Sequence, residues 1–416
     1  MAYTTINKSS EHFNTKLYTG NGSTNAITGV GFQPDLLWFK NRTSAINHMW
    51  FDSVRGINKY FYGNLSEAEG TSSSVLTAVG SDGFTVGANN NVNGSSNGIA
   101  SWNWKAGTSF TNDASSTGIG TIDSAGSVNQ DAGFSICSYT GTGSAGTIGH
   151  GLSATPKMII AKNRSDGGQF WAVYHASLGG ANKYLSLNST SSEQGGTAIW
   201  NSTHPTSSVF SVAGHGTTNE NGDGFIAYCF AEKKGYSKFG SYVGNNNADG
   251  NFIYLGFKPS FFLAKNSTES GYSWEIFDNK RNSPDGVGNI IKNRLFPDSS
   301  ASEGINSGGY IDFVSNGVKI RKAGDTNSNN TYIYMAFAEN PFVTSSGVPA
   351  TARWWLRKML PDSRQEEINI LFKKIIHTLI IINIILGSIT VYDKFIYVPD
   401  TSIKTIYINE LYPDEV

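Results

Sequence analysis

Charged residues and cysteines are scarce in this chain, and their scarcity excludes several classes of protein. Only 15% of the 416 residues are charged, and the net charge is -1 at pH 7. Without a basic excess to neutralise phosphates, nucleic acid is not an expected partner. Two cysteines are too few for a disulfide framework, and Cys137 and Cys229 lie in apolar runs typical of buried thiols. The N-terminus lacks the charged and apolar regions of a signal peptide, so none is predicted.

Catalytic and cofactor motifs are also missing. The sequence contains no phosphate-binding loop, dinucleotide fingerprint, His-Glu-x-x-His or Gly-x-Ser-x-Gly. The seven histidines are scattered and do not recur at a fixed spacing. No catalytic residue, cofactor or metal is therefore predicted, although oxygen-rich loops would suit Ca²⁺ better than other ions.

Glycine and aromatic residues are abundant, with 47 glycines and 12% aromatics. Short apolar runs alternate with turn signals up to residue 353, and no ten-residue helical pattern interrupts them. This pattern is typical of antiparallel β-sandwiches and disfavours a parallel sheet covered by helices. We therefore predict an all-β fold.

A short tyrosine–glycine motif occurs three times, which indicates one module used three times. The copies are Tyr18-Thr19-Gly20, Tyr139-Thr140-Gly141 and Tyr242-Val243-Gly244. A lysine follows about 23 residues later and a tryptophan about ten residues after that. These residues are Lys40, Lys162 and Lys265, and Trp50, Trp171 and Trp274. We interpret the lysines as structural and the tryptophans as core residues that hold one place in each copy, although aromatic faces also stack on sugars.

The repeats divide the chain into segments. We predict an N-terminal arm at 1–16, β-sandwich repeats at 17–107, 133–235 and 236–343, a linker at 108–132, and a divergent tail at 344–416. The linker is expected to form an exposed connector or a loose hairpin. Within the tail, a helix is predicted to begin near Asp362 or Ser363. Residues 375–392 carry no charge and are just long enough to cross a bilayer. A membrane segment, a helix for trimerisation or docking, and a frameshift or readthrough product all remain open for the tail.

Candidate ligand-binding residues lie where the copies differ, because binding sites usually occupy variable loops. An asparagine-rich stretch precedes the last strand of each module, and its amides and carboxylates could bind hydroxyl groups or Ca²⁺. The candidates are Asn89, Asn91, Asn93, Asn219, Asn221, Asp223, Asn327 and Asn329. The alternative is that they form solvated turns.

Hydrolysis of a sugar polymer would require two Asp or Glu side chains that face a glycosidic bond. Glu69, Glu193 and Glu303 recur in similar polar loops, but no closely spaced acid pair accompanies them. A turn residue that accepts hydrogen bonds from backbone amides explains each of them as well. We therefore expect no enzyme, and a polysaccharide depolymerase is kept as an alternative.

Several motifs together resemble a known family. They are the Tyr-Thr-Gly opening, Gly31-Phe32-Gln33-Pro34, the apolar strand that ends at Lys40-Asn41-Arg42, Gly83-Phe84-Thr85-Val86-Gly87, Trp102-Asn103-Trp104-Lys105-Ala106-Gly107, and the closing Phe-Ala-Glu. The chain resembles, over residues 17–353, an uncharacterised repeat family of structural proteins from tailed phages, many of them marine. The tail beyond Arg353 departs from that family's pattern.

The resemblance implies concanavalin A-like jelly-roll sandwiches in tandem and a place on the virion surface, as in a tail fibre or spike. It supplies no functional residues. The expected partners are a host-surface glycan bound by the loop tips, other virion proteins and, by analogy alone, two further copies in a trimer. A purely structural decoration protein of the head or tail is the main alternative.

Overall fold

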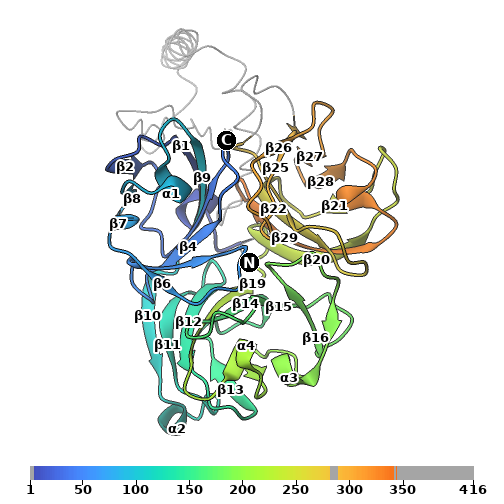
Figure 1. Ribbon diagram of the computed structural model, residues 1–416. Helices are drawn as coiled ribbons and strands as arrows, with labels where there is room; N and C mark the ends of the chain where they lie inside the picture. Colours follow the sequence, from blue (N-terminus) through green and yellow to red (C-terminus); the bar gives the residue numbers. More distant parts are fainter. Residues whose placement is uncertain (1–3, 282–288, 342, 344–416) are drawn as a thin grey trace, which may run out of the picture. The chain divides into compact units, whose positions relative to one another are not determined.

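The computed structural model describes residues 4–281, 289–341 and 343, which all lie within one compact unit. The predictions for the tail at 344–416, including the membrane segment at 375–392, lie outside the described residues. The fold is mostly β, with antiparallel sheets that pair into sandwich-like modules. In Figure 1 the strands of module 1 run from blue to cyan, those of module 2 from cyan through green to yellow-green, and those of module 3 from yellow-green to orange.

Each module has an inner and an outer sheet, named here by their positions relative to the centre of the unit. The inner sheet of module 1 contains, in spatial order, β1 (Phe13–Thr19), β9 (Gly98–Trp104), β3 (Leu36–Asn41), β4 (Met49–Asp52), β5 (Lys59–Tyr62) and β6 (Gly70–Thr71). Its outer sheet contains β2 (Asn25–Thr28), β8 (Gly83–Val86) and β7 (Leu76–Gly80).

Module 2 extends the same arrangement. Its inner sheet contains β10 (Thr108–Asn112), β11 (Ser124–Asn129), β12 (Phe134–Thr140), β19 (Gly224–Ala231), β14 (Pro156–Asn163), β15 (Ala172–His175), β16 (Lys183–Ser186) and β17 (Gln194–Gly195). Its outer sheet contains β13 (Gly146–Gly149) and β18 (Val209–Val212).

Module 3 repeats it once more. Its inner sheet contains β20 (Ser237–Val243), β29 (Thr331–Ala338), β22 (Pro259–Asn266) and β23 (Glu275–Asp278). Its outer sheet contains β21 (Phe252–Tyr254), β28 (Gly317–Ile320), β27 (Ile311–Val314) and β24 (Ile290–Ile291), and a small separate pair is formed by β25 (Asn293–Arg294) and β26 (Gly304–Ile305).

Helices are short in the described residues, as the sequence predicts. They comprise α1 (Asn90–Asn93), α2 (Ala114–Thr117), α3 (Thr197–Trp200), α4 (Gly216–Asn219) and the 3₁₀ turns η1 (Ser9–Glu11) and η2 (Asp325–Asn327). Three of these, α1, α4 and η2, immediately precede the closing strands β9, β19 and β29.

The stretch at 108–132 is not a plain linker. It forms β10 and β11, which extend the inner sheet of module 2 beyond its opening strand β12. Ile122 and Val128 enter the core of module 2, and Phe110 packs against it. The few apolar residues in this polar stretch are therefore enough to fix it, because β12 offers a free edge for pairing.

The central strands of each inner sheet are buried on both faces. In β3, Leu36 and Trp38 belong to a hydrophobic cluster shared by all three modules, whereas Leu37 and Phe39 belong to the core of module 1. We call the shared cluster the central core. Burial on both faces explains why these strands are continuous apolar runs without polar alternation.

Aromatic residues from the three modules meet in the central core. The ring centroid of Trp104 lies 6.2 Å from that of Phe230 in module 2 and 5.9 Å from that of Phe337 in module 3. Phe13 stacks on Phe337 with a centroid separation of 4.9 Å. The modules are consequently not independent beads, since each depends on the other two to cover its inner sheet.

We predict that Phe337→Ala destabilises the whole unit by about 3–5 kcal/mol, because it opens a cavity in the shared core. Urea unfolding followed by circular dichroism and by tryptophan fluorescence should show one shifted transition. Phe252→Ala is the matched control, since Phe252 is 47% exposed and its loss should cost about 0.5 kcal/mol or less. A separate early transition of one module would contradict the shared core.

Candidate functional site

The recurring Tyr-x-Gly motif fixes each opening strand to the loop before the closing strand. The three tyrosine hydroxyls donate hydrogen bonds of 2.6–2.8 Å to backbone carbonyls of that loop, from Tyr18 to Val92, Tyr139 to Thr218, and Tyr242 to Thr326. A Cβ at Gly20, Gly141 or Gly244 would lie only 2.0–2.2 Å from a backbone oxygen of the same loop. The motif is therefore structural, and only the middle residue is free to vary.

Three of the predicted ligand-binding residues are also structural. The side chains of Asn93, Asn219 and Asn327 are buried and bind the backbone of the opening loop. Asn219, for example, donates to the Ser144 carbonyl at 2.6 Å and accepts from the Thr142 amide at 2.9 Å. An amide without exposed surface cannot touch a ligand, so the prediction is corrected for these three residues.

The other predicted residues lie nearer the surface. Asn89 caps α1 by accepting a hydrogen bond from the amide of Asn91. Asp223 accepts a hydrogen bond of 2.7 Å from the asparagine of the Lys-Asn pair in module 2. Two side chains are exposed, those of Asn221 and Asn329. The loop tips therefore retain a few accessible amides.

The three repeated lysines join neighbouring modules. Each is buried and donates to one carbonyl of its own module and to one carbonyl of a neighbour, at 2.6–3.1 Å. The neighbour's acceptors are Ser300 for Lys40, Ser66 for Lys162 and Thr190 for Lys265. Burial lowers the pKa of each lysine to about 8. The predicted structural role holds, with carbonyls as partners and no carboxylate.

These contacts run in one direction around the unit. The lysine of module 2 reaches module 1, that of module 3 reaches module 2, and that of module 1 reaches module 3. Equivalent head-to-tail interfaces that return to their origin form a closed ring. We call this arrangement the three-module ring.

Glu69 binds arginines from two modules. Its carboxylate accepts from Arg164 of module 2 at 2.9 Å and from Arg55 of its own module at 3.3 Å. Arg55 also binds Asp52 at 2.5 Å, and Asp52 accepts from the Tyr228 hydroxyl of module 2 at 2.7 Å. Burial alone would raise the pKa of Glu69, but these arginines hold it below its ordinary value.

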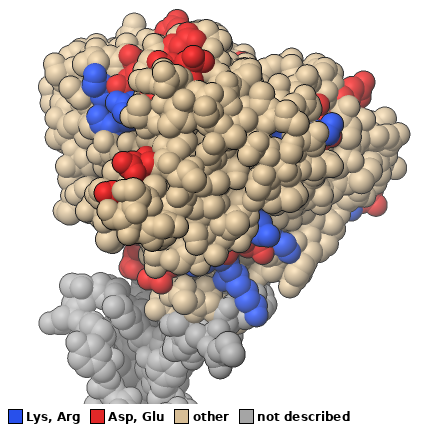
Figure 2. All heavy atoms as spheres, turned by 90° about the horizontal axis from the view of Figure 1, so that it is seen from below, with Lys and Arg blue, Asp and Glu red and all other residues tan. Residues whose placement is uncertain are grey.

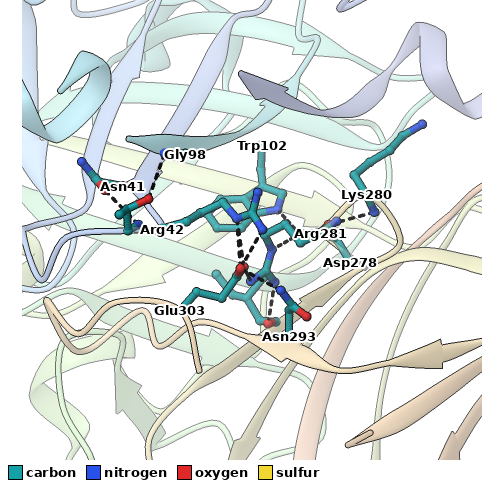
Figure 3. Close-up of polar contacts among 11 residues, drawn as sticks. Asn41, Arg42, Gly98, Trp102, Asp278, Lys280, Arg281, Asn293 and Glu303 are labelled. Carbon is teal, nitrogen blue, oxygen red and sulfur yellow. Dashed lines mark hydrogen bonds and ion pairs between the residues drawn. The ribbon is translucent and has the colours of Figure 1, made fainter. Parts of the chain in front are cut away.

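Glu303 occupies the same place between modules 3 and 1 (Figure 3). It accepts from Arg42 of module 1 at 2.7 Å and from Arg281 of module 3 at 2.9 Å. Arg281 binds Asp278 at 2.6 Å, and Asp278 accepts from the indole of Trp102 at 3.0 Å. Two carboxylates balance two arginines in each network, so neither leaves a net buried charge.

The third interface, between modules 2 and 3, lacks this network. Leu178 stands three residues after the end of β15, where β4 and β23 are each followed by an arginine. Ser267 follows the Lys-Asn pair, where the other modules also have an arginine. Glu193 keeps its backbone bond to the Ser267 carbonyl at 2.8 Å, but its carboxylate pairs with Lys183 at 3.5 Å. Both arginines and the aspartate of the other two networks are therefore absent from this interface, and the glutamate alone remains.

The residues that end β4, β15 and β23 each match the hydrogen-bonding groups that the neighbouring module presents. Asp52 accepts a hydrogen bond from the Tyr228 hydroxyl, and Asp278 accepts one from the Trp102 indole. Tyr228 and Trp102 hold equivalent positions in the closing strands of their modules. Module 3 has Met335 at that position, which offers no donor. Module 2 accordingly has His175, whose Nε2 donates to a backbone carbonyl of module 3 at 3.1 Å.

The expected equivalence of Trp50, Trp171 and Trp274 is wrong. Trp50 pairs with Trp38 within the sheet, whereas Trp171 and Trp274 precede β15 and β23 by one residue. Their true counterpart is His48, which precedes β4 in the same way. The backbone amides of these three residues each bind an Asn or Asp side chain, and their side chains each reach a carbonyl of the neighbouring module. The loop between the repeated lysine and this position is one residue shorter in module 1 than in modules 2 and 3, which shifted the spacing.

A charged cluster without counterpart occurs in module 3. Arg294 bridges Glu275 at 3.0 Å and Asp325 at 2.9 Å, and Lys322 pairs with Asp325. Burial raises the pKa of Glu275 to about 8 against the opposing effect of Arg294. Because the arginine binds both carboxylates, it fills the space where a glycosidic bond would have to lie.

Metal and membrane features are absent from the part of the chain that the structure describes. No group of three His, Cys, Asp or Glu residues there could hold a metal ion, and no helix there is long and apolar enough to span a bilayer. Cys137 and Cys229 are buried free thiols, as predicted, and burial raises the pKa of Cys137 to about 12. On the face shown in Figure 2, charged side chains form small groups separated by wide uncharged areas.

Comparison with known proteins gives one match. Residues 8–341 match a domain of unknown function, DUF7483. The chain belongs to the DUF7483 family. No curated protein and no solved structure matches it. The family spans all three modules of the ring, so the domain as defined corresponds to the closed arrangement and not to a single sandwich.

The inter-module networks were missed at the sequence level, although a signal was present. Asp52 and Arg55 have the same three-residue spacing as Asp278 and Arg281. Two copies of this pair, together with the recurring loop glutamate, indicate a charge network. Which arginine of the neighbouring module completes it is decided only by the closure of the ring.

We predict that Arg281→Leu destabilises the fold by about 3–5 kcal/mol, because it leaves Asp278 and Glu303 buried without one of their arginines. Denaturant unfolding would measure this. Arg321→Leu is the control, since the Arg321 side chain is 43% exposed and its pair with Asp312 should contribute about 1 kcal/mol or less. Similar costs for the two variants would contradict a buried network.

We predict that Glu69→Gln lowers the free energy of unfolding at neutral pH. The difference from the wild type should become smaller as the pH falls below 4.5, the ordinary pKa of Glu. A depressed pKa contributes stability above the unfolded-state value, and protonation through the folded-state value removes it. Unfolding curves at several pH values would measure this. Glu193→Gln, which removes a pair with a partly exposed lysine, is the control. A constant difference for Glu69→Gln across the acid range would exclude the role given to its arginines.

Proposed function

We propose that this chain is a phage virion-surface protein, as in a tail fibre or spike, whose lectin-like jelly-roll modules bind host-surface glycans. The three-module ring is the observation that carries the proposal, because it holds three equivalent sets of loops in one compact unit. Weak sites presented together toward a repeating polymer gain affinity through multivalency. The resemblance of the repeated motifs to those of phage structural proteins supports the proposed place on a virion.

The contacts of the loop glutamates favour binding over hydrolysis. Glu69 and Glu303 are each occupied by two arginines, and Glu193 pairs with a lysine. A general acid for sugar cleavage would need a raised pKa and access to the substrate. These glutamates are therefore better explained as parts of the module interfaces than as a depolymerase site.

A structural decoration role is the second candidate, and the buried asparagines favour it. Since Asn93, Asn219 and Asn327 are committed to the fold, the loops have fewer groups left for recognition. Immunogold labelling of virions would separate the candidates. A position throughout the capsid lattice would favour decoration, whereas labelling at the tail tip would favour attachment.

We predict that the full chain binds host-envelope polysaccharide on a glycan array, and that Asn221→Ala with Asn329→Ala weakens this binding severalfold by removing exposed loop amides. Thr111→Ala, an exposed change on β10, is the control and should leave binding unchanged. Absence of binding by the wild type to polysaccharides of a susceptible host would contradict the proposal.

A further inference from the structure

Two aromatic side chains of module 3 are turned toward solvent. Phe252 is 47% and Tyr254 is 59% exposed, while Ile253 between them is 5% exposed and lies in the module core. Alternate residues of a strand point to opposite faces, so the two rings share the outer face of β21. This strand forms the free edge of its sheet (Figure 1). Among the described residues, the other large hydrophobic side chains classed as exposed are all aliphatic.

The fold does not require these rings. The strands β2, β13 and β21 align through Ile27, Ile148 and Ile253, each buried and each paired with the adjacent outer strand. In that register, module 1 has Ala26 and Thr28 and module 2 has Thr147 and Gly149 where module 3 has Phe252 and Tyr254. Small residues serve equally well in two copies, so the exposed aromatic pair is a special feature of module 3.

The phenyl ring of Phe252 lies against the neighbouring strand. A Cβ at Gly317 would lie 2.9 Å from its Cε2 atom and 3.0 Å from its Cζ atom. The carbonyl oxygen of Ile253, 2.1 Å from such a Cβ, already requires glycine at this position of β28, and the lack of a side chain also lets the ring rest on the backbone. A ring supported on one side and open on the other is prepared for stacking, because less conformational freedom is lost on binding.

Tyr254 is supported in a similar way. The Nζ atom of Lys238 donates to the Tyr254 carbonyl at 3.0 Å and lies 5.0 Å from the centroid of its ring. The same hydrogen bond occupies a carbonyl of the edge strand, which makes β21 a poorer template for an added strand. The position favours recognition of a ring face over strand pairing with a peptide.

Polar groups lie beside the aromatic pair. Lys319 stands directly opposite Phe252 in the sheet and pairs with Asp249 at 2.7 Å. The Asp249 side chain is 81% exposed, so its carboxylate and the lysine present an acceptor and a donor to solvent. Aromatic faces bordered by charged hydrogen-bonding groups suit a ligand with one apolar face and a hydroxylated edge.

We propose that Phe252 and Tyr254 form a stacking site for a pyranose ring of a surface polysaccharide, with Lys319 and Asp249 binding its hydroxyl groups. This inference rests on the proposed function and assigns it a second, loop-independent site in module 3. The C–H face of the sugar covers the two rings, and its edge reaches the ion pair. Modules 1 and 2 contain no equivalent site.

The test is saturation-transfer difference NMR on the full chain with methyl pyranosides of glucose, N-acetylglucosamine and glucuronic acid. We expect transfer to the ring C–H protons of at least one probe. Phe252→Ala and Tyr254→Ala should each weaken binding about tenfold, and Phe252→Tyr should retain it. Thr28→Ala and Thr147→Ala are matched controls in the same register of the other modules and should have no effect.

The outcomes separate this site from the loop sites. Binding that survives both alanine substitutions but is lost in Asn221→Ala with Asn329→Ala would overturn the stacking site and leave the proposed function standing. No transfer to any probe, combined with array binding by the wild type, would also overturn the stacking site. Concentration-dependent dimerisation abolished by Tyr254→Ala would instead assign the aromatic pair to a second copy. An unchanged melting temperature in the alanine variants would show that lost binding does not reflect unfolding.

Discussion

The burial of the central strands of every inner sheet on both faces is the constraint on which the rest of this structure depends. A sandwich normally exposes the outside of each sheet, but here that face is as apolar as the interior and must be covered. Three modules solve the problem together by turning these faces toward one central core. Trp104, Phe230 and Phe337 come from three different modules and meet there. Stability, spacing and orientation of the modules all follow from this requirement.

Closure of the ring brings polar groups of neighbouring modules into buried contact, where hydrogen-bond donors must be paired with acceptors. Where module 2 offers a tyrosine hydroxyl and module 1 an indole N–H, the facing residue is an aspartate held by an arginine. Where module 3 offers only methionine, the facing residue is a neutral histidine that donates to the backbone. Burial lowers the pKa of His175 to about 4, which keeps it uncharged. At the ends of β4, β15 and β23, each module therefore carries a residue that pairs with the groups its neighbour presents.

Residues shared by all three copies serve the fold, which narrows the search for function to places where the copies differ. The shared tyrosines, lysines and buried asparagines donate or accept hydrogen bonds with backbone groups, and the shared glycines allow close backbone contacts. Few of their polar groups are therefore left to bind a ligand. Differences concentrate in the exposed loop amides and on β21, where Phe252 and Tyr254 replace small residues. Those rings add nothing to the core and expose apolar surface, which favours a role in recognition.

The sequence by itself determined the all-β character, the three modules and the strands around each repeated lysine, because local turn chemistry and apolar runs encode them. It could not determine that the modules share a core, since a strand buried on both faces reads the same whichever partner covers it. Spacing alone aligned Trp50 with Trp171, while the sheet register aligned His48 instead. The loop asparagines looked accessible because polarity is visible in a sequence and burial is not. Only the tertiary structure decided these points, because closing the ring sets which groups lose contact with water.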